Sequence, residues 1–245
     1  MTSPSRAQLV EWAENYRVEI KEIDKPISKG LHDSFHYELT NYWRLALLSR
    51  QVGKFEEADI AKKLIFRVRT YIERSLSGSI DLAITHKKFV IEHLFEKSIF
   101  SSSIKQGLSL RLPLTSCVPT EQCHWSCYAH DGMDAGRYPI IKGVINGFIA
   151  NLYENADENA RKAISVQMEK NIIKAVKQSL IEAQKSGFDR DPRIRFSHVG
   201  EIAAYPDFAN HFAYLVKKLS GGAVSCVVYT RHPNAKKLDP QNYVI

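Results

Sequence analysis

Three of the chain's four cysteines lie within eleven residues, at positions Cys117, Cys123 and Cys127. A loop this short brings three thiols to one point at little cost in chain entropy, and thiolates are the ligands that zinc and iron–sulfur clusters select. A disulfide would leave one thiol over, and three core thiols in one polar loop that contains a proline would be unusual. The spacing therefore predicts a metal centre, with an iron–sulfur cluster preferred to zinc.

Structural zinc is the main alternative for this loop. His124 and His130 both lie close enough in the sequence to supply a fourth ligand beside the three cysteines. Zinc loops usually pair their cysteines in Cys-x-x-Cys turns, and none occurs here. The zinc alternative nevertheless stays open, because the residues alone do not separate the two metals.

The cysteine loop lies between a predicted strand and a predicted helix. Leu108, Leu110, Leu112 and Leu114 alternate along one strand face. Pro139 suits the first position of a helix. The apolar face of that helix would carry Ile141, Val144, Ile145, Phe148, Ile149 and Leu152. This order places the cysteines at the carboxyl end of a strand, where α/β folds build their sites.

The chain after the cysteine loop continues to alternate helices with strands. A long amphipathic helix would begin at a capping box formed by Asn155 and Glu158. A strand over 193–197 and a helix over about 206–219 follow, before a nearly all-apolar strand over 223–231. The apolar stripe of the long helix would be Ile164, Met168, Ile172, Val176 and Leu180.

These elements predict an α/β fold with a parallel sheet. The carboxyl ends of parallel strands meet at one edge of a sheet. We therefore expect the cysteine loop, Gly200-Glu201 and Tyr229–Arg231 to lie at the same edge. That edge is the predicted functional site.

The first hundred residues differ from the rest, because their pattern is helical throughout. We predict a helical N-terminal domain over residues 1–104 and a cysteine-loop α/β domain over residues 105–245, with the serine run 101–103 as the linker. We expect the helical domain to pack on the sheet or to form a surface for a protein partner.

The overall charge is mildly basic, with a net charge of +7 and a pI of about 9.1. This charge permits a nucleic-acid partner but does not imply one, because the basic residues are spread along the chain. No apolar run is long enough to span a bilayer, and the N-terminus lacks the apolar core of a signal peptide. We therefore expect a cytoplasmic protein with reduced thiols and no membrane partner.

The order of these motifs resembles that of radical S-adenosylmethionine (SAM) enzymes. That family places three cysteines in the loop after its first barrel strand, with an aromatic residue beside the last one, which here is Tyr128. It places a Gly-Glu at the end of its second strand, which here is Gly200-Glu201. A closer resemblance is to small phage and plasmid proteins of the gene-product-88-like family, through Cys-Tyr-Ala, His-x-Gly-acid and Tyr-Thr-Arg motifs. It covers about residues 107–240.

The resemblance implies a specific chemistry and fold. Three thiolates would hold a four-iron cluster with one iron open to SAM, and Gly200-Glu201 would contact the amino group of SAM. The implied fold is a partial parallel (β/α) barrel-like sheet, and the implied function is that of a radical SAM-type iron–sulfur protein with an unknown substrate. The alternative is a zinc- or cluster-stabilised binding protein without turnover, acting on nucleic acid for a phage or plasmid.

The chain departs from the radical SAM pattern in three respects. Five and then three residues separate its cysteines, where the family has three and then two. The family's Gly-Gly-Glu is Val-Gly-Glu at 199–201. About fourteen residues follow the last predicted strand, too few for a six-strand barrel. We therefore expect either a partial barrel or one that another chain completes.

Three further residues carry site or core expectations. His198, two residues before Gly200, could point into the site or be an ordinary histidine at a strand end. Arg231 could meet a SAM carboxylate or a substrate phosphate, or lie on the surface. Cys226 lies among valines, and we expect it to be an inert core thiol.

Overall fold

A computed structural model of the chain describes part of its length. The described residues are 53, 56, 62–63, 65–66, 69–70, 72–74, 76–78, 80, 94–95, 98–103, 107–119, 127, 129, 137–185, 191–196 and 199–243. Three of the predicted site residues, Cys123, Tyr128 and His198, lie outside these ranges.

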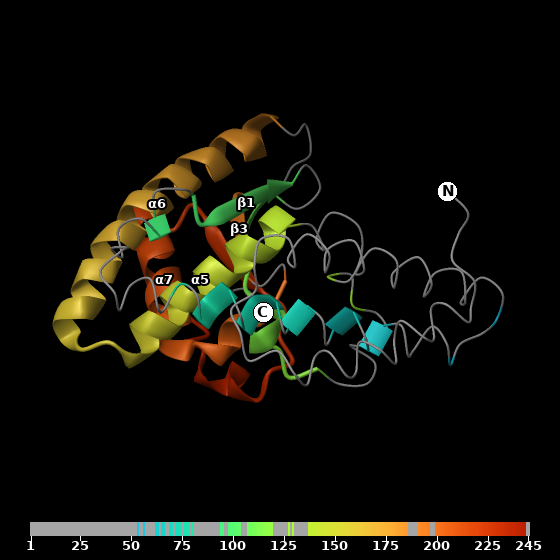
Figure 1. Ribbon diagram of the computed structural model, residues 1–245. Coiled ribbons are helices and arrows are strands. Elements are labelled where there is room, and N and C mark those ends of the chain that lie inside the picture. The colour runs from blue at the N-terminus through green and yellow to red at the C-terminus, as the bar shows by residue number, and fades with distance from the viewer. Residues whose placement is uncertain are drawn as a thin grey trace.

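The described part of the chain forms a mixed α/β fold around a four-stranded sheet (Figure 1). Its strands are β1 (Phe100–Ser103), β2 (Gly107–Leu110), β3 (Arg193–Phe196) and β4 (Ser225–Val228), in the order β1-β2-β3-β4. The pairs β2–β3 and β3–β4 are parallel, which confirms the predicted parallel pairing. The pair β1–β2 is antiparallel, so the sheet as a whole is mixed.

The predicted linker at 101–103 is wrong, because these serines lie in β1. Phe100 pairs with Leu110 across the two strands, and its buried ring packs edge-on against Phe212 at a centroid distance of 5.6 Å. The hydroxyl of Ser109 also donates to the carbonyl of Ser101 at 3.3 Å. This edge strand is therefore ordered by the buried Phe100 ring and by pairing with β2, and not by local strand propensity.

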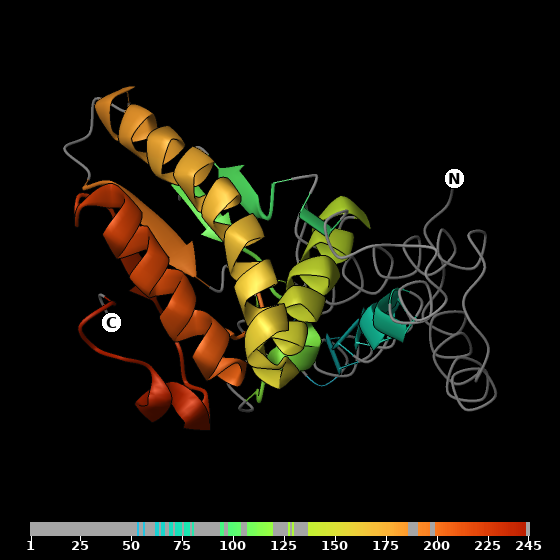
Figure 2. The same ribbon diagram turned by 90° about the vertical axis from the view of Figure 1, so that its left-hand side faces the viewer.

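Three helices with defined bounds accompany the sheet, namely α5 (Arg137–Asn155), α6 (Glu158–Lys185) and α7 (Pro206–Ser220). Helices α6 and α7 lie side by side over the sheet, with α6 against β2 and β3 and α7 against β4 (Figure 2). The apolar core lies between these helices and the sheet. Among the described residues, no helix is both long and apolar enough to cross a membrane.

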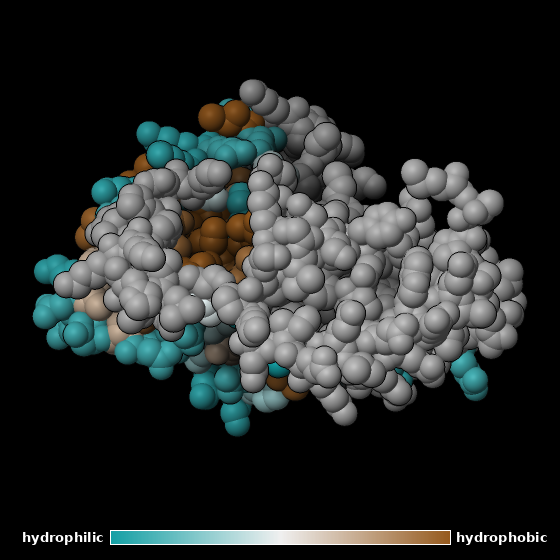
Figure 3. Space-filling model, in the orientation of Figure 1, coloured by the Kyte–Doolittle hydropathy of each residue, from teal (hydrophilic) through white to brown (hydrophobic). Residues whose placement is uncertain are grey.

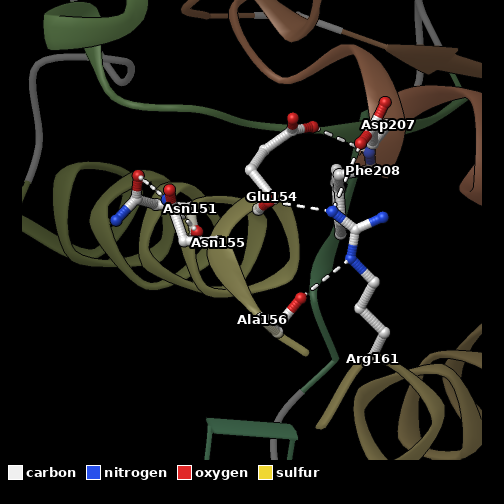
Figure 4. Close-up of polar contacts among 7 residues, drawn as sticks. All are labelled: Asn151, Glu154, Asn155, Ala156, Arg161, Asp207 and Phe208. Atoms are coloured by element: carbon white, nitrogen blue, oxygen red, sulfur yellow. Dashed lines mark hydrogen bonds and ion pairs between the residues drawn. The ribbon is translucent and has the colours of Figure 1, made fainter. Parts of the chain in front are cut away.

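Helix α6 confirms its predicted apolar stripe but not its predicted cap. Four stripe positions are at most 5% exposed, namely Ile164, Met168, Ile172 and Val176. The side chain of Asp157, rather than Asn155, caps the helix by accepting the N–H of Ala160 at 2.8 Å. Asn155 is the last residue of α5, and its amide donates to the carbonyl of Asn151 at 2.8 Å (Figure 4). The predicted capping box is therefore wrong.

Helix α7 agrees with its prediction and has a well-defined start. Its inward residues Phe208, Phe212, Leu215 and Val216 are all buried. The Glu154 carboxylate at the end of α5 accepts the N–H of Phe208 at 2.9 Å, which satisfies one of the unpaired donors of the first turn. Figure 4 also shows Arg161 between the Glu154 carbonyl and Asp207. These contacts fix the start of α7, which closely follows the Gly200-Glu201 turn.

The described residues between 62 and 78 have helical backbone, as predicted for this part of the chain. The apolar residues Ile65 and Ile72 of this segment are almost fully buried. The rest of the predicted helical N-terminal domain lies mostly outside the described ranges.

On the face drawn in Figure 3, the described residues include both hydrophilic and hydrophobic side chains. On the outer side of α6, Val166, Ile173 and Ile181 are between 41% and 49% exposed. They are separated by exposed lysines, and single exposed aliphatic side chains of this kind are common on soluble domains.

Candidate metal centre at the strand ends

Cys117 and Cys127 both pack against one small apolar cluster. The cluster consists of the buried residues Leu114, Ala129 and Val199, and both half-buried cysteines pack against it. Cys117 directly follows the short 3-10 turn Leu114–Ser116, and its N–H donates to the carbonyl of Leu114 at 2.9 Å. Two of the three predicted ligands therefore approach one place from the two ends of the cysteine loop.

The third predicted ligand and both histidines near it are not among the described residues. Within the part of the chain that the structure describes, no group of three His, Cys, Asp or Glu side chains forms a metal-ligand set. Cys123, His124 and His130 lie outside that part, as does Tyr128 beside Cys127. Cys117, Cys127 and Cys226 carry thiols and form no disulfide.

The backbone at Leu112 and Pro113, which leads from β2 into the cysteine loop, passes between glycines. A Cβ atom on Gly147 of α5 would lie 2.5 Å from Pro113 Cδ. A Cβ on Gly200 would lie 2.6 Å from the Pro113 carbonyl oxygen, and Gly200 has a φ of +78°. The close approach that Gly200 permits here is therefore to the start of the cysteine loop. Both contacts require glycine, since no side chain fits in these gaps.

The Gly200-Glu201 turn is hydrogen-bonded to the same segment. The N–H of Glu201 donates to the hydroxyl of Ser116 at 2.8 Å, and that hydroxyl donates to the carbonyl of Pro113 at 2.7 Å. The N–H of Leu112 donates to the carbonyl of Val199 at 2.8 Å. These bonds continue the β2–β3 contact beyond the strands and hold Glu201 close to Cys117.

The Glu201 carboxylate is oriented by the end of β4. The hydroxyl of Thr230 donates to Glu201 Oε2 at 2.6 Å, and the backbone N–H of Arg231 also donates to the carboxylate. Burial raises the pKa of Glu201, while the bond from Thr230 and the charge of His232 lower it. The result is a half-buried carboxylate that is held in place before any ligand arrives.

The predicted meeting of three strand ends is therefore present. Ser116 from the β2 end, Glu201 from the β3 end and Thr230 from the β4 end form one hydrogen-bonded chain. Arg231 takes part through its backbone, while its side chain is exposed. The neighbouring Tyr229 is 63% exposed, and the Arg195 guanidinium lies 5.2 Å from the centroid of its ring.

Sequence reasoning missed Ser116 and Tyr205 as parts of this site. Burial, together with the nearby charges of Glu73, Cys117 and Glu154, raises the pKa of Tyr205 to about 12. Tyr205 therefore shares the surroundings of Cys117. The position of Tyr205 between Gly200-Glu201 and the predicted helix over 206–219 could have identified it as a site residue from the sequence. The position of Ser116 next to a loop cysteine gives no such indication.

Comparisons with protein-family models, with curated proteins and with solved structures give no match for this chain. A function for the protein must therefore come from its own residues. The informative features are the two cysteines that pack against one apolar cluster and the oriented carboxylate of Glu201, whose N–H binds the residue next to Cys117.

Proposed function

We propose that this protein is a radical SAM-type iron–sulfur protein. In this proposal, Cys117, Cys123 and Cys127 bind a four-iron cluster and SAM binds beside Gly200-Glu201. The main support is that Cys117 and Cys127 pack on one apolar cluster, next to the serine that accepts the N–H of Glu201. The start of the cysteine loop and the Gly200-Glu201 turn are therefore in direct contact, which supports one site formed by both.

The residues at this site fit such a cluster. Three thiolates would leave one iron open for an external ligand, and the apolar cluster of Leu114, Ala129 and Val199 would limit the access of water. When bound, the cluster and SAM together would supply radical chemistry, and the protein's part would be orientation and exclusion of solvent.

Glu201 would recognise the ammonium group of SAM. An ionised carboxylate only accepts hydrogen bonds, so it suits a group that only donates them. Thr230 and the N–H of Arg231 keep the carboxylate oriented and so reduce the ordering cost of binding. Tyr128, His198 and the Arg231 guanidinium would complete the pocket, the last by meeting the SAM carboxylate.

The proposal extends to the wider architecture. The parallel strands β2, β3 and β4 would be part of a (β/α) barrel-like sheet, and residues 1–104, apart from the strand β1, would form a helical N-terminal domain. We propose a cytoplasmic location and a phage or plasmid origin on the sequence resemblance alone. The substrate and any protein or nucleic-acid partner are left open.

Calorimetric titration of SAM into cluster-loaded protein tests the SAM site. We expect Glu201→Gln to weaken SAM binding about tenfold or more with unchanged iron content, because a charge-assisted hydrogen bond is lost. Glu158→Gln, at an exposed position at the start of α6, is the matched control and should bind SAM normally. If cluster-loaded wild-type protein binds no SAM, the zinc- or cluster-stabilised binding protein becomes the better account.

A further inference from the structure

A buried ion pair lies far from the cysteine loop in sequence but beside it in space. Arg69 and Glu73 stand four residues apart in the helical segment 62–78, with Arg69 Nε 3.2 Å from Glu73 Oε1. Their side chains are 2% and 1% exposed. Burying a charge this deeply removes its hydration, which is costly for each ion unless other contacts compensate for the loss.

Each member of the pair also binds one end of the cysteine loop. Glu73 Oε2 accepts the N–H of Thr115 at 3.0 Å, and Glu73 further accepts the N–H of Leu114. Arg69 Nη1 donates to the carbonyl of Ala129. Thr115 lies two residues before Cys117, and Ala129 lies two residues after Cys127.

The pair is a poor device for stability alone. Burial raises the pKa of Glu73, even though Arg69 and the two backbone N–H groups lower it. Apolar side chains of similar volume usually stabilise such a position as well as a buried ion pair does, or better. What apolar side chains cannot do is hold two specific backbone groups at a fixed separation.

We propose that Arg69 and Glu73 are positioning residues that join the two ends of the cysteine loop and so preorganise Cys117 and Cys127 to bind a metal. This inference rests on the proposed metal-binding function of the loop. It also gives the helical segment 62–78 a defined task at the metal centre. Supporting contacts of this kind typically change metal affinity by about 10–100-fold when they are removed.

The test uses the double variant Arg69→Met/Glu73→Met, which keeps the volume of the pair but removes its charges and hydrogen bonds. The full chain carries Cys123→Ser, so that Cys117 and Cys127 are the thiols left in the loop. Phenylarsine oxide, which bridges two nearby thiols, is titrated into the metal-free protein. Arg74→Met is the matched control, since Arg74 is exposed on the same segment.

We expect the double variant to bind phenylarsine oxide about tenfold more weakly than the parent, with an equal or higher unfolding temperature. The control should bind it as the parent does. Equal affinity in a folded double variant would overturn the inference. Because this readout needs no iron, it separates the inference from the proposed cluster: weaker binding in the variant supports the positioning role even if the wild-type chain takes up no iron.

A second variant covers the case in which the double variant fails to fold. Arg69→Met alone releases the Ala129 end and leaves the Thr115 end bound, since Glu73 can be buried as the neutral acid. We expect a smaller loss of phenylarsine oxide affinity in the same direction. No loss in this variant would also overturn the inference.

Discussion

The hydroxyl of Thr230 donates a 2.6 Å hydrogen bond to the carboxylate of Glu201, and so joins the ends of two neighbouring parallel strands. This bond favours the ionised form of Glu201 and lowers its pKa, whereas burial raises it. The two residues together set the pH range over which the carboxylate can accept an ammonium group.

The affinity of cluster-loaded protein for SAM should therefore fall as the pH falls through the raised pKa of Glu201. Thr230→Val removes the bond that lowers this pKa, so the loss should begin at a higher pH than in the wild type. Thr230→Ser keeps the hydroxyl and should follow the wild type. The measurement is SAM affinity by calorimetry between pH 5 and 8. An unchanged midpoint in Thr230→Val would contradict the role of Thr230.

Gly200 should tolerate alanine much less well than Gly221. Both have positive φ, so alanine should cost each about 1–2 kcal/mol in backbone strain. At Gly200 the new Cβ would also lie 2.6 Å from the Pro113 carbonyl oxygen, which should add about 1–3 kcal/mol, while Gly221 has open space. Denaturant unfolding of Gly200→Ala and Gly221→Ala measures the difference. Equal losses would show that the β2 end does not approach Gly200 as described.

Phe212 of α7 packs against both β1 and β3. The centroid of its ring lies 5.6 Å from that of Phe100 and 4.9 Å from that of Phe196, and the side chain is fully buried. Phe212→Ala should lower the free energy of unfolding by about 3–5 kcal/mol. Tyr214→Ala, on the exposed side of α7, should change it by about 0.5 kcal/mol or less. Similar losses in the two variants would contradict this packing.

Cys226 should resist alkylation in the folded protein. It is 3% exposed, and burial raises the pKa of its thiol to about 12, so very little thiolate forms at neutral pH. Iodoacetamide at pH 8, followed by mass spectrometry, should label Cys117 and Cys127 in metal-free protein and leave Cys226 unmodified. Labelling of Cys226 at the rate seen in denaturant would contradict its place in the core.

Much of the sheet could be predicted because its signals are local. Alternating leucines before the cysteine loop and the apolar run around Cys226 identify β2 and β4, and regular apolar spacing identifies α6. Parallel pairing then forces the ends of β2, β3 and β4 to one edge, so the meeting of Glu201 and Thr230 followed from topology.

The missed features depend on tertiary contacts that no local pattern encodes. The serines of β1 become a strand through pairing with β2. The predicted cap of α6 was wrong because a capping residue is defined by the exact first residue of the helix. Since α6 begins at Glu158, the cap is Asp157. Arg69 and Glu73 resemble an ordinary exposed pair four residues apart, and nothing nearby in the sequence shows that Thr115 and Ala129 will cover them.

The metal content of the protein tests the central claim most directly. After anaerobic purification and reconstitution, the wild-type chain should be brown and contain about four iron and four sulfide per chain. Cys117→Ala, Cys123→Ala and Cys127→Ala should each lose this content, whereas Cys226→Ala should keep it. A colourless wild-type protein that holds one equivalent of zinc, and retains it in place of iron after reconstitution, would contradict the iron–sulfur account.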